Sequence, residues 1–500
     1  MLATTLLSLA AVAPLQSEYH VDPILGSDAN SGSAADPWRT VTHAASAAVR
    51  PAEILLAPGT YGTVSGETFP LTIEGELVLR SALGRDTVEV DAPAMEAGVV
   101  VRNGARLEAV TVTARSTGVV MESDYGQPPV EVVDVDVRAA AGALYGTGIS
   151  AGDGTVAQCR VSDLSFGIVH WGDDLVVEDC VITGCSTGIN VRMWYLPQTG
   201  VMDVRRCEVS DCTQRGIGLQ DGCFGTPFRL RLEDSLVVRN GSPVFGGGIE
   251  INDCASSSLN NFEVHVNGCT VVDNRGPGIQ NLGFADVTID SSIVAGNSGG
   301  DIENGAVVKY TLVGDGSGLA GPGPVHPGAN RSGDPRFVDA AAGDYTLRFD
   351  SPAVDGGARF GPDFTGRGRS VDGDLDLTPR PDMGALEHRT LVGPDTIPLG
   401  VPFQLSASGP AGGFTSVVVS HLGYASTGIT TPYGRLFVEP LGAYRLAAIP
   451  TSGGAPDSMV VPAFTDPALV GTSTGFQALT RSAAAPAGAA FSAPVLVPIE

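Results

Sequence analysis

The segment VEDCVITGCSTGI (residues 177–189) decides the fold, because copies of it follow along the chain. They are VRRCEVSDCTQRGI (204–217), LEDSLVVRNGSPVFGGGI (232–249), VNGCTVVDNRGPGI (266–279) and IDSSIVAGNSGGDI (289–302). In each copy a small residue comes shortly before a run rich in Val, Ile or Thr, and a Gly-Ile or Asp-Ile step ends the copy. Weaker copies extend the series upstream, so that a small or apolar anchor residue recurs about every 26 residues, at Val110, Val135, Cys159, Cys180, Cys207, Ser235, Cys269 and Ser292.

This repeat predicts a stacked β structure. Short runs of Val and Ile between Gly, Asn and Asp turns are typical of strands, and they exclude helical repeats of similar length. One copy cannot bury its apolar face alone, but stacking pairs each strand with its counterpart in the next copy. We therefore predict a parallel β-helix with rungs over residues of about 100–305. Five residues beyond the anchor, Asn240, Asn274 and Asn297 are expected to form a hydrogen-bonded ladder along its axis.

The composition limits the partners. A net charge of −26 repels nucleic acid and anionic lipid, so we expect neither as a partner. With 43% hydrophobic and only 17% charged residues, the chain can pack a core and is not a disordered chain.

The start of the chain predicts export. An apolar run from Leu2 to Val12, followed by Ala13, is too short to span a bilayer but suits a secretory signal peptide over residues 1–18. Because no later segment has 18 continuous apolar residues, we expect no transmembrane helix. The expected location is outside the cell, and we expect a monomer.

Both ends of the repeat resemble known families. The pieces VDP, GSDANSGS, DPWRTVTHA and ILLAPGTY, within residues 19–62, resemble the N-terminal domain of unassigned function that begins many secreted right-handed parallel β-helix proteins. The segment DPRFVDAAAGDYTLRFDSPAVDGG and the segment DGDLDLTPRPDMGALE, within residues 334–387, resemble the closing part of the choice-of-anchor β-helix family. The resemblance implies a right-handed, pectate-lyase-like fold and a bacterial secreted or surface location. It implies no activity.

These features divide the chain into two predicted domains. The β-helix domain covers residues 19–390, with an N-terminal cap over 19–62 and a closing segment over 334–390 that completes the solenoid. Within the cap, a helix expected at Thr40–Val49 would plug the open end. Residues 391–500 contain short apolar runs between Gly- and Pro-bearing turns, which predict a β-sandwich. The fold class is therefore all-β.

The chain has eight cysteines, and two of them differ from the rest. Cys223 and Cys254 follow the Gly-Ile steps of neighbouring rungs, which places both in loops on one side of the solenoid. Rungs stack at about 4.8 Å, within the Cα separation that a disulfide needs, so we predict a Cys223–Cys254 bridge. The anchor cysteines are expected to be small core residues.

One acidic segment could hold a metal ion. Asp372, Asp374 and Asp376 alternate along VDGDLDLTPRPDM, and Ca²⁺ prefers such carboxylate ligands. An EF-hand loop would need Glu at its twelfth position, where Met383 stands. A bound Ca²⁺ and a solvated acidic turn both remain open.

The residues after each Gly-Ile step predict a surface for carbohydrate. Aromatic, amide and charged side chains gather there on consecutive rungs, and such groups stack on sugars and hydrogen-bond their hydroxyls. The predicted substrate-binding residues are His170, Trp171, Trp194, Tyr195, Gln220, Glu250 and Asn252. Ordinary loop composition is the alternative.

We therefore expect a secreted or surface protein that binds extracellular polysaccharide, and the sequence leaves an enzyme open. Asp221 and Asp253, one rung apart, could serve a glycoside hydrolase as its two carboxylates. Arg192 could neutralise a uronate in a polysaccharide lyase. Because no complete catalytic signature accompanies these residues, binding is the preferred hypothesis.

Overall fold

The computed structural model describes residues 17–500 with internal gaps at residues 125, 142, 144–145, 194–199, 222–227, 243–245, 253–261, 318, 320–329, 370, 421–423, 439–443, 482–484 and 486–488. The chain divides into two compact units, one ending at Val169 and one running from His170 to Glu500. Each unit is described by itself below.

The first unit contains rungs of three strands, one in each of three parallel sheets. Sheet 1 contains β1 (Ser17–Val21), β2 (Ala52–Leu56), β5 (Leu77–Ser81), β8 (Arg106–Glu108), β11 (Val130–Val133) and β14 (Gly154–Ala157). Sheet 2 contains β3 (Gly59–Gly62), β6 (Val88–Asp91), β9 (Thr111–Ala114), β12 (Asp136–Ala139) and β15 (Arg160–Ser162). Sheet 3 contains β4 (Leu71–Glu74), β7 (Ala97–Arg102), β10 (Thr117–Glu122), β13 (Thr147–Ala151) and β16 (Phe166–His170).

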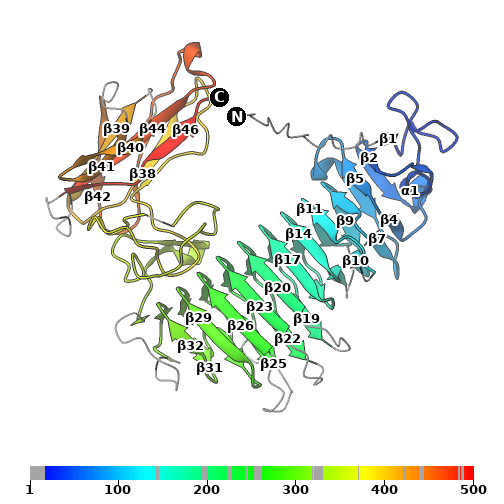
Figure 1. Cartoon of the computed structure of the whole chain (residues 1–500), viewed down its shortest axis with the longest axis horizontal. Coiled ribbons are helices and arrows are strands. Elements are labelled where there is room, and N and C mark those ends of the chain that lie inside the picture. Colours follow the sequence, from blue (N-terminus) through cyan, green and yellow to red (C-terminus); the bar gives the residue numbers. More distant parts are fainter. Residues whose placement is uncertain are drawn as a thin grey trace, which may run out of the picture. The chain divides into compact units, whose positions relative to one another are not determined.

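The second unit contains rungs of the same kind (Figure 1). Its part of sheet 1 contains β17 (Asp174–Glu178), β20 (Gly200–Arg205), β23 (Phe228–Glu233), β26 (Phe262–Asn267), β29 (Asp286–Asp290) and β32 (Val307–Lys309). Sheet 2 contains β18 (Val181–Thr183), β21 (Glu208–Ser210), β24 (Leu236–Val238), β27 (Thr270–Val272), β30 (Ile293–Ala295), β33 (Leu312–Val313) and β34 (Arg331–Ser332). Sheet 3 contains β19 (Thr187–Met193), β22 (Arg215–Asp221), β25 (Ile249–Asn252), β28 (Ile279–Asn281) and β31 (Ile302–Glu303). The predicted right-handed parallel β-helix is confirmed.

The predicted anchor residues line the core. All eight of them are at most 1% exposed. The residue before each anchor adopts a positive φ, for example 54° at Asp179, 49° at Asp234 and 65° at Gly268. A single left-handed residue turns the chain sharply from sheet 1 into sheet 2, and Asp, Asn and Gly adopt that conformation most readily.

The Asn ladder stacks along the interior beside the Gly-Ile steps. The Asn274 side chain accepts from the backbone N–H of Asn240 at 2.9 Å and donates to Asn297 Oδ1 at 2.8 Å. A Cβ on Gly248 would lie 2.9 Å from Asn274 Nδ2 and 2.5 Å from the Gly278 carbonyl oxygen. Glycine begins the step because the ladder and the next rung leave no room for a side chain there.

The N-terminal helix is shorter than predicted. Helix α1 spans Val41–Ala47, and Thr40 is its N-cap, with its side chain accepting from the His43 N–H. The Glu67 carboxylate accepts from the Val41 N–H at 2.7 Å and from the Thr42 N–H at 2.9 Å. The helix stops before Arg50 because a residue that precedes a proline, here Pro51, disfavours the helical region.

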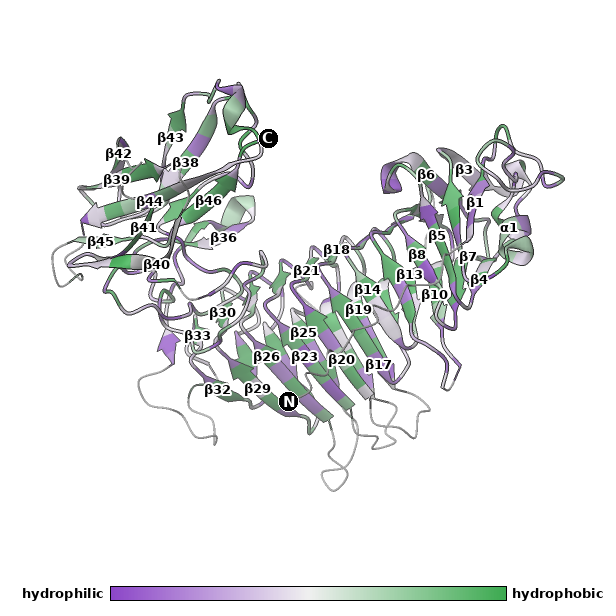
Figure 2. Cartoon of the chain, turned by 45° about the horizontal axis from the view of Figure 1, so that its top comes forward, coloured by the Kyte–Doolittle hydropathy of each residue, from purple (hydrophilic) through white to green (hydrophobic). Residues whose placement is uncertain are grey.

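The closing segment lies elsewhere than predicted. It contains β35 (Phe337–Asp339) and β36 (Asp344–Leu347), and it packs on the outer face of sheet 2 instead of completing the solenoid. Its apolar residues Tyr345, Leu347, Met383 and Ala385 share a core with residues of β24, β27 and β30. Those strands have apolar residues at outward positions because this segment covers them. In Figure 2 the sheet 1 strands β23 and β26 alternate hydrophobic and hydrophilic residues.

The last part of the chain forms antiparallel sheets, which fit the predicted β-sandwich. One sheet contains β37 (Leu391–Val392), β38 (Phe403–Ala407) and β43 (Asp457–Val461). Another contains β42 (Tyr444–Thr451), β39 (Gly413–Ser420), β44 (Ser473–Arg481), β45 (Ala489–Phe491) and β46 (Val495–Pro498), and β40 (Tyr424–Thr431) pairs with β41 (Gly434–Val438). Leu405, Val417 and Phe476 are fully buried in the core of these sheets. No helix in the described part of the chain is long and apolar enough to cross a membrane.

Candidate functional site

The three outer faces of the second unit's rungs differ in what covers them. Sheet 2 lies under the closing segment over β24, β27 and β30. Sheet 1 has charged groups that pair with each other, with Arg229 2.6 Å from Glu263 and Asp203 2.5 Å from Arg205. Sheet 3 has an apolar inner face and an outer face of mixed polar groups. This outer face, from β19 to β31 and with Trp171 after β16, is called the sheet 3 face below.

Strand register aligns the polar residues of the sheet 3 face in two rows. Neighbouring strands pair in parallel without a shift, so residues at the same position after the Gly-Ile step lie side by side. The first row is Asn190, Gly218, Glu250, Gln280 and Glu303, and the second is Arg192, Gln220 and Asn252. Residues between the rows, such as Val191 and Leu219, point inward and are buried.

An ion pair crosses the first row at Gly218, which has no side chain. Arg215 Nε lies 2.7 Å from Glu250 Oε1, although Glu250 is only 7% exposed. The Arg215 chain passes over Gly218, where a Cβ would meet Arg215 Cδ at 3.2 Å. Asn190, in the same row, is 3% exposed, and its Oδ1 accepts no hydrogen bond from the residues that the structure describes. The first row therefore contains a carboxylate that is paired with a cation and, two strands away, an amide oxygen.

The structure places some of the predicted substrate-binding and catalytic residues on the sheet 3 face. Arg192, Gln220 and Asn252 form the second row, and Glu250 lies in the first. Trp171 is 40% exposed directly after β16. Asp221 is the last residue of β22, where it pairs with Met193, but its side chain lies outside the described residues.

The prediction that His170 binds substrate is wrong. The residue is fully buried, and its ring centroid lies 6.1 Å from that of Phe228, so it cannot bind a substrate on the surface. Strand side chains alternate, so His170 points inward like Ile168, two residues before it.

Five predicted residues lie outside the described part of the chain: Trp194, Tyr195, Cys223, Asp253 and Cys254. Their roles in sugar binding, catalysis and the disulfide stay predictions. The six cysteines that the structure describes carry buried thiols.

Sequence reasoning missed Arg215, Gln280 and Glu303. Gln280 and Glu303 directly follow Ile279 and Ile302, so the rule that found Glu250 applies to them as well. Arg215 precedes its Gly-Ile step, and nothing local in the sequence marks it as the partner of Glu250.

A separate acidic cluster could hold a metal ion. Ligand oxygens of Asp355, Asp372 and Asp374 lie within 4.8 Å of one another. Asp355 joins the cluster in place of the predicted Asp376, whose Oδ1 accepts from the Thr378 N–H at 2.6 Å. Burial raises the pKa of Asp355 to about 7 and that of Asp372 to about 6, and the neighbouring Asp374 carboxylate adds to both shifts. Carboxylates held this close repel one another, and a divalent cation would relieve that repulsion.

Two family models match parts of the chain. Residues 97–294 match the right-handed beta helix region, and residues 24–123 match a protein of unknown function named DUF1565. No curated protein matches the sequence.

Solved structures share the fold. The pectate lyase Pel9A is 15% identical with a TM-score of 0.50, over 75% of this chain and 96% of its own. A rhamnogalacturonan lyase is 12% identical with a TM-score of 0.35, over 51% of this chain and 82% of its own. The Dettilon tailspike protein is 13% identical with a TM-score of 0.37, over 91% of this chain and 74% of its own. At 15% identity the likeness to Pel9A shows a shared fold and nothing finer.

Proposed function

We propose that the sheet 3 face binds an extracellular polysaccharide. One observation carries the proposal: amide, cationic and acidic side chains lie in two registered rows beside an exposed Trp171. The regular spacing of rungs, about 4.8 Å, presents equivalent groups at steps close to the length of a sugar unit. Sheet 2 is covered and the cited groups of sheet 1 are charge pairs, whereas the sheet 3 face adds a row of Arg192, Gln220 and Asn252 to its Arg215–Glu250 pair, which suits an extended polar ligand.

The proposal includes a location outside the cell and membership of the choice-of-anchor family. A secreted or cell-surface bacterial protein of the choice-of-anchor kind would meet polysaccharides where it works. The pectate lyase among the solved structures makes polygalacturonate the first probe to try.

The test is retention of the full chain on immobilised polysaccharides, acidic ones such as polygalacturonate and alginate beside neutral ones such as xylan. Soluble products are measured in parallel as reducing ends and as ultraviolet absorbance of unsaturated ends. Retention without products supports binding. Reducing ends alone would instead indicate a hydrolase, and both signals together a lyase. Asp221→Asn and Asp253→Asn would then lose turnover by orders of magnitude with little change in binding. Neither retention nor products would refute the proposal.

Trp171→Ala is expected to weaken polysaccharide binding about tenfold or more. An aromatic side chain at a binding site contributes 1 to 2 kcal/mol or more, and about 1.4 kcal/mol corresponds to tenfold. Phe360→Ala is the matched control, because Phe360 is 68% exposed and lies in the closing segment. Affinity electrophoresis of both variants measures the effect, and an equal loss in the two would show that the sheet 3 face is not the binding surface.

We also propose that Asp355, Asp372 and Asp374 bind Ca²⁺ and stabilise the closing segment. The close approach of the three carboxylates supports this role, because oxygen ligands from carboxylates are those that Ca²⁺ prefers. Asp355 and Asp372 also accept hydrogen bonds from backbone N–H groups of Asp374 and Leu377, which fix their side chains.

A chelator is therefore expected to lower the melting temperature of calcium-loaded protein. A ligand that binds only the native state stabilises it by about 2.7 kcal/mol at a hundredfold excess over Kd. Asp374→Asn should abolish this sensitivity, while Asp376→Asn should keep it. Scanning calorimetry with and without the chelator measures the shift. The proposed site is wrong if the wild-type protein does not respond, or if the Asp376 variant alone loses the response.

A further inference from the structure

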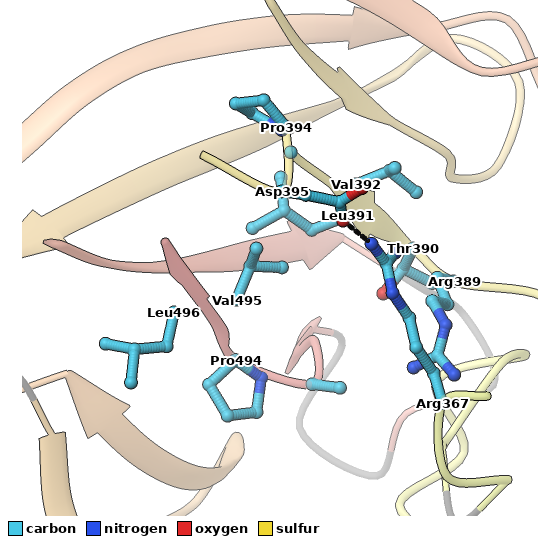
Figure 3. A pocket seen from close by; sticks show the side chains of 12 residues that line it. Arg367, Arg389, Thr390, Leu391, Val392, Pro394, Asp395, Pro494, Val495 and Leu496 are labelled. Atoms are coloured by element: carbon cyan, nitrogen blue, oxygen red, sulfur yellow. Dashed lines mark hydrogen bonds and ion pairs between the residues drawn. The ribbon is translucent and has the colours of Figure 1, made fainter. Parts of the chain in front are cut away.

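A pocket of about 250 Å³ lies between residues 367–395 and the start of β46 (Figure 3). Its lining includes Arg367, Arg389, Thr390, Pro394, Pro494 and Val495. Pockets for drug-sized ligands have about 300 to 1,000 Å³, so this one fits a single small ring or an end group rather than a length of polymer.

One side of the pocket is cationic. Figure 3 shows Arg367 and Arg389 running beside Thr390. Arg389 is held in place, because its Nη2 donates to the Gly368 carbonyl at 2.9 Å and lies 3.4 Å from Oδ2 of the buried Asp363. Arg367 pairs with Asp395, whose side chain is 85% exposed. Such an exposed pair contributes little stability, so a competing carboxylate could replace Asp395 at small cost.

The same side holds an unused hydrogen-bonding group. Thr390 is 1% exposed, and its hydroxyl forms no hydrogen bond with any residue that the structure describes. Buried polar groups nearly always have partners, because leaving one without a partner costs about 1 to 3 kcal/mol. A polar ligand in the pocket would supply the missing partner.

The opposite side is apolar. Pro494, Val495 and Leu496 lie across from the arginines in Figure 3, and Leu496 is 49% exposed. A bare anion such as phosphate would leave this apolar surface without a contact. A sugar ring has apolar faces as well as hydroxyls, so a ring with a charged substituent uses both sides of the pocket.

We propose that this pocket binds one sugar residue that carries a carboxylate, a hexuronate or the end of an acidic glycan. The ligand carboxylate replaces Asp395 as the partner of Arg367. A ligand oxygen accepts a hydrogen bond from the Thr390 hydroxyl, and the sugar ring packs on Pro494 and Val495. This second site does not depend on polysaccharide binding at the sheet 3 face.

The test is titration of the full chain with galacturonate, followed by NMR or calorimetry. Galactose and inorganic phosphate are the comparison ligands, because one lacks the charge and the other lacks the ring. We expect galacturonate to bind at least tenfold more tightly than either. Arg367→Gln should weaken its binding tenfold or more, and Asp395→Asn should tighten it severalfold because the competing carboxylate is gone. Thr390→Val should weaken it severalfold without lowering the melting temperature.

Two controls make the result specific. Arg336→Gln removes another exposed arginine that pairs with an aspartate, Asp350, and should leave galacturonate binding unchanged. Phe360→Ala, which removes an exposed aromatic side chain of the closing segment outside the pocket lining, should do the same. The proposal is overturned if galacturonate does not saturate the protein, if phosphate binds as tightly, or if Asp395→Asn weakens binding. Asp395 is exposed, so its variant should fold even if Arg367→Gln does not.

Discussion

Replacing Asp234 by Asn is expected to destabilise the protein by about 3 to 5 kcal/mol, because it removes the nearer of the two acidic partners of a buried arginine, the other being Glu387 at 3.8 Å. The Arg369 side chain, in the closing segment, is 0% exposed, and its Nη2 lies 2.9 Å from Asp234 Oδ1. Arg359 contacts the same carboxylate, with its Nη2 2.7 Å from Asp234 Oδ2. One aspartate at a rung turn thus anchors two arginines of the closing segment.

Asparagine tests the charge with the least change in shape. It tolerates the left-handed backbone of Asp234, whose φ is 49°, so the turn itself should survive. Its neutral amide cannot compensate the Arg369 guanidinium, which has been withdrawn from water. The loss should therefore come from the charge and not from the backbone.

Asp179→Asn is the matched control. Asp179 occupies the equivalent turn two rungs earlier, with a φ of 54°, but its side chain is 39% exposed and pairs with Arg206. Exposed ion pairs contribute about 0 to 1 kcal/mol, so this variant should lose little. Denaturant midpoints of the two variants, together with the protease sensitivity of residues 337–389, measure the difference. Equal and small losses would show that Asp234 does not anchor the segment.

The position of the closing segment could not be predicted from local pattern. Its anchoring bond joins Arg369 to Asp234, 135 residues apart, and no periodicity links two such positions. The rungs were predictable because every copy repeats the same inward residue at the same spacing. A weaker signal was present in the strands beneath the segment: Leu236–Val238 and Ile293–Ala295 have no polar residue at their outward positions. Strands with both faces apolar must be covered on both faces.

In the candidate site, too, features that repeat from rung to rung could be predicted, whereas contacts between distant residues could not. The position after the Gly-Ile step correctly placed Glu250 and Asn252 on strand β25, since register repeats from rung to rung. The prediction for His170 ignored the strand period of two, which would have turned this residue inward beside Ile168. The partner of Glu250 is Arg215 in the preceding rung, and Asp355 joins Asp372 from a separate turn. The first contact depends on the reach of the long Arg215 side chain and the second on how two separate turns meet in the fold, and spacing alone gives neither.

Asn274→Ala is expected to cost about 3 kcal/mol or more, because Asn274 is the middle of the interior ladder. The residue is 1% exposed, and its Oδ1 accepts from the N–H of Asn240 at 2.9 Å. Its Nδ2 donates to the Val237 carbonyl at 3.1 Å and to Asn297 Oδ1 at 2.8 Å. Alanine would leave the Asn240 N–H buried without its partner, at about 1 to 3 kcal/mol, and would remove a donor from both the Val237 carbonyl and Asn297 Oδ1.

The residue next to Asn297, Asp301, shows where an asparagine is not needed. At one end, Asp301 Oδ1 accepts from the Asn297 N–H at 3.1 Å, while its Oδ2 accepts from the Asp315 N–H at 2.8 Å, so a group that only accepts suffices. Asn274 must accept on one side and donate on the other. Asn274→Asp should therefore destabilise as much as alanine, since it places a charged oxygen against Asn297 Oδ1. Asn252→Ala, at an exposed position, should change the denaturant midpoint little, and a midpoint for Asn274→Ala equal to that of this control would rule out an energetic role for the ladder.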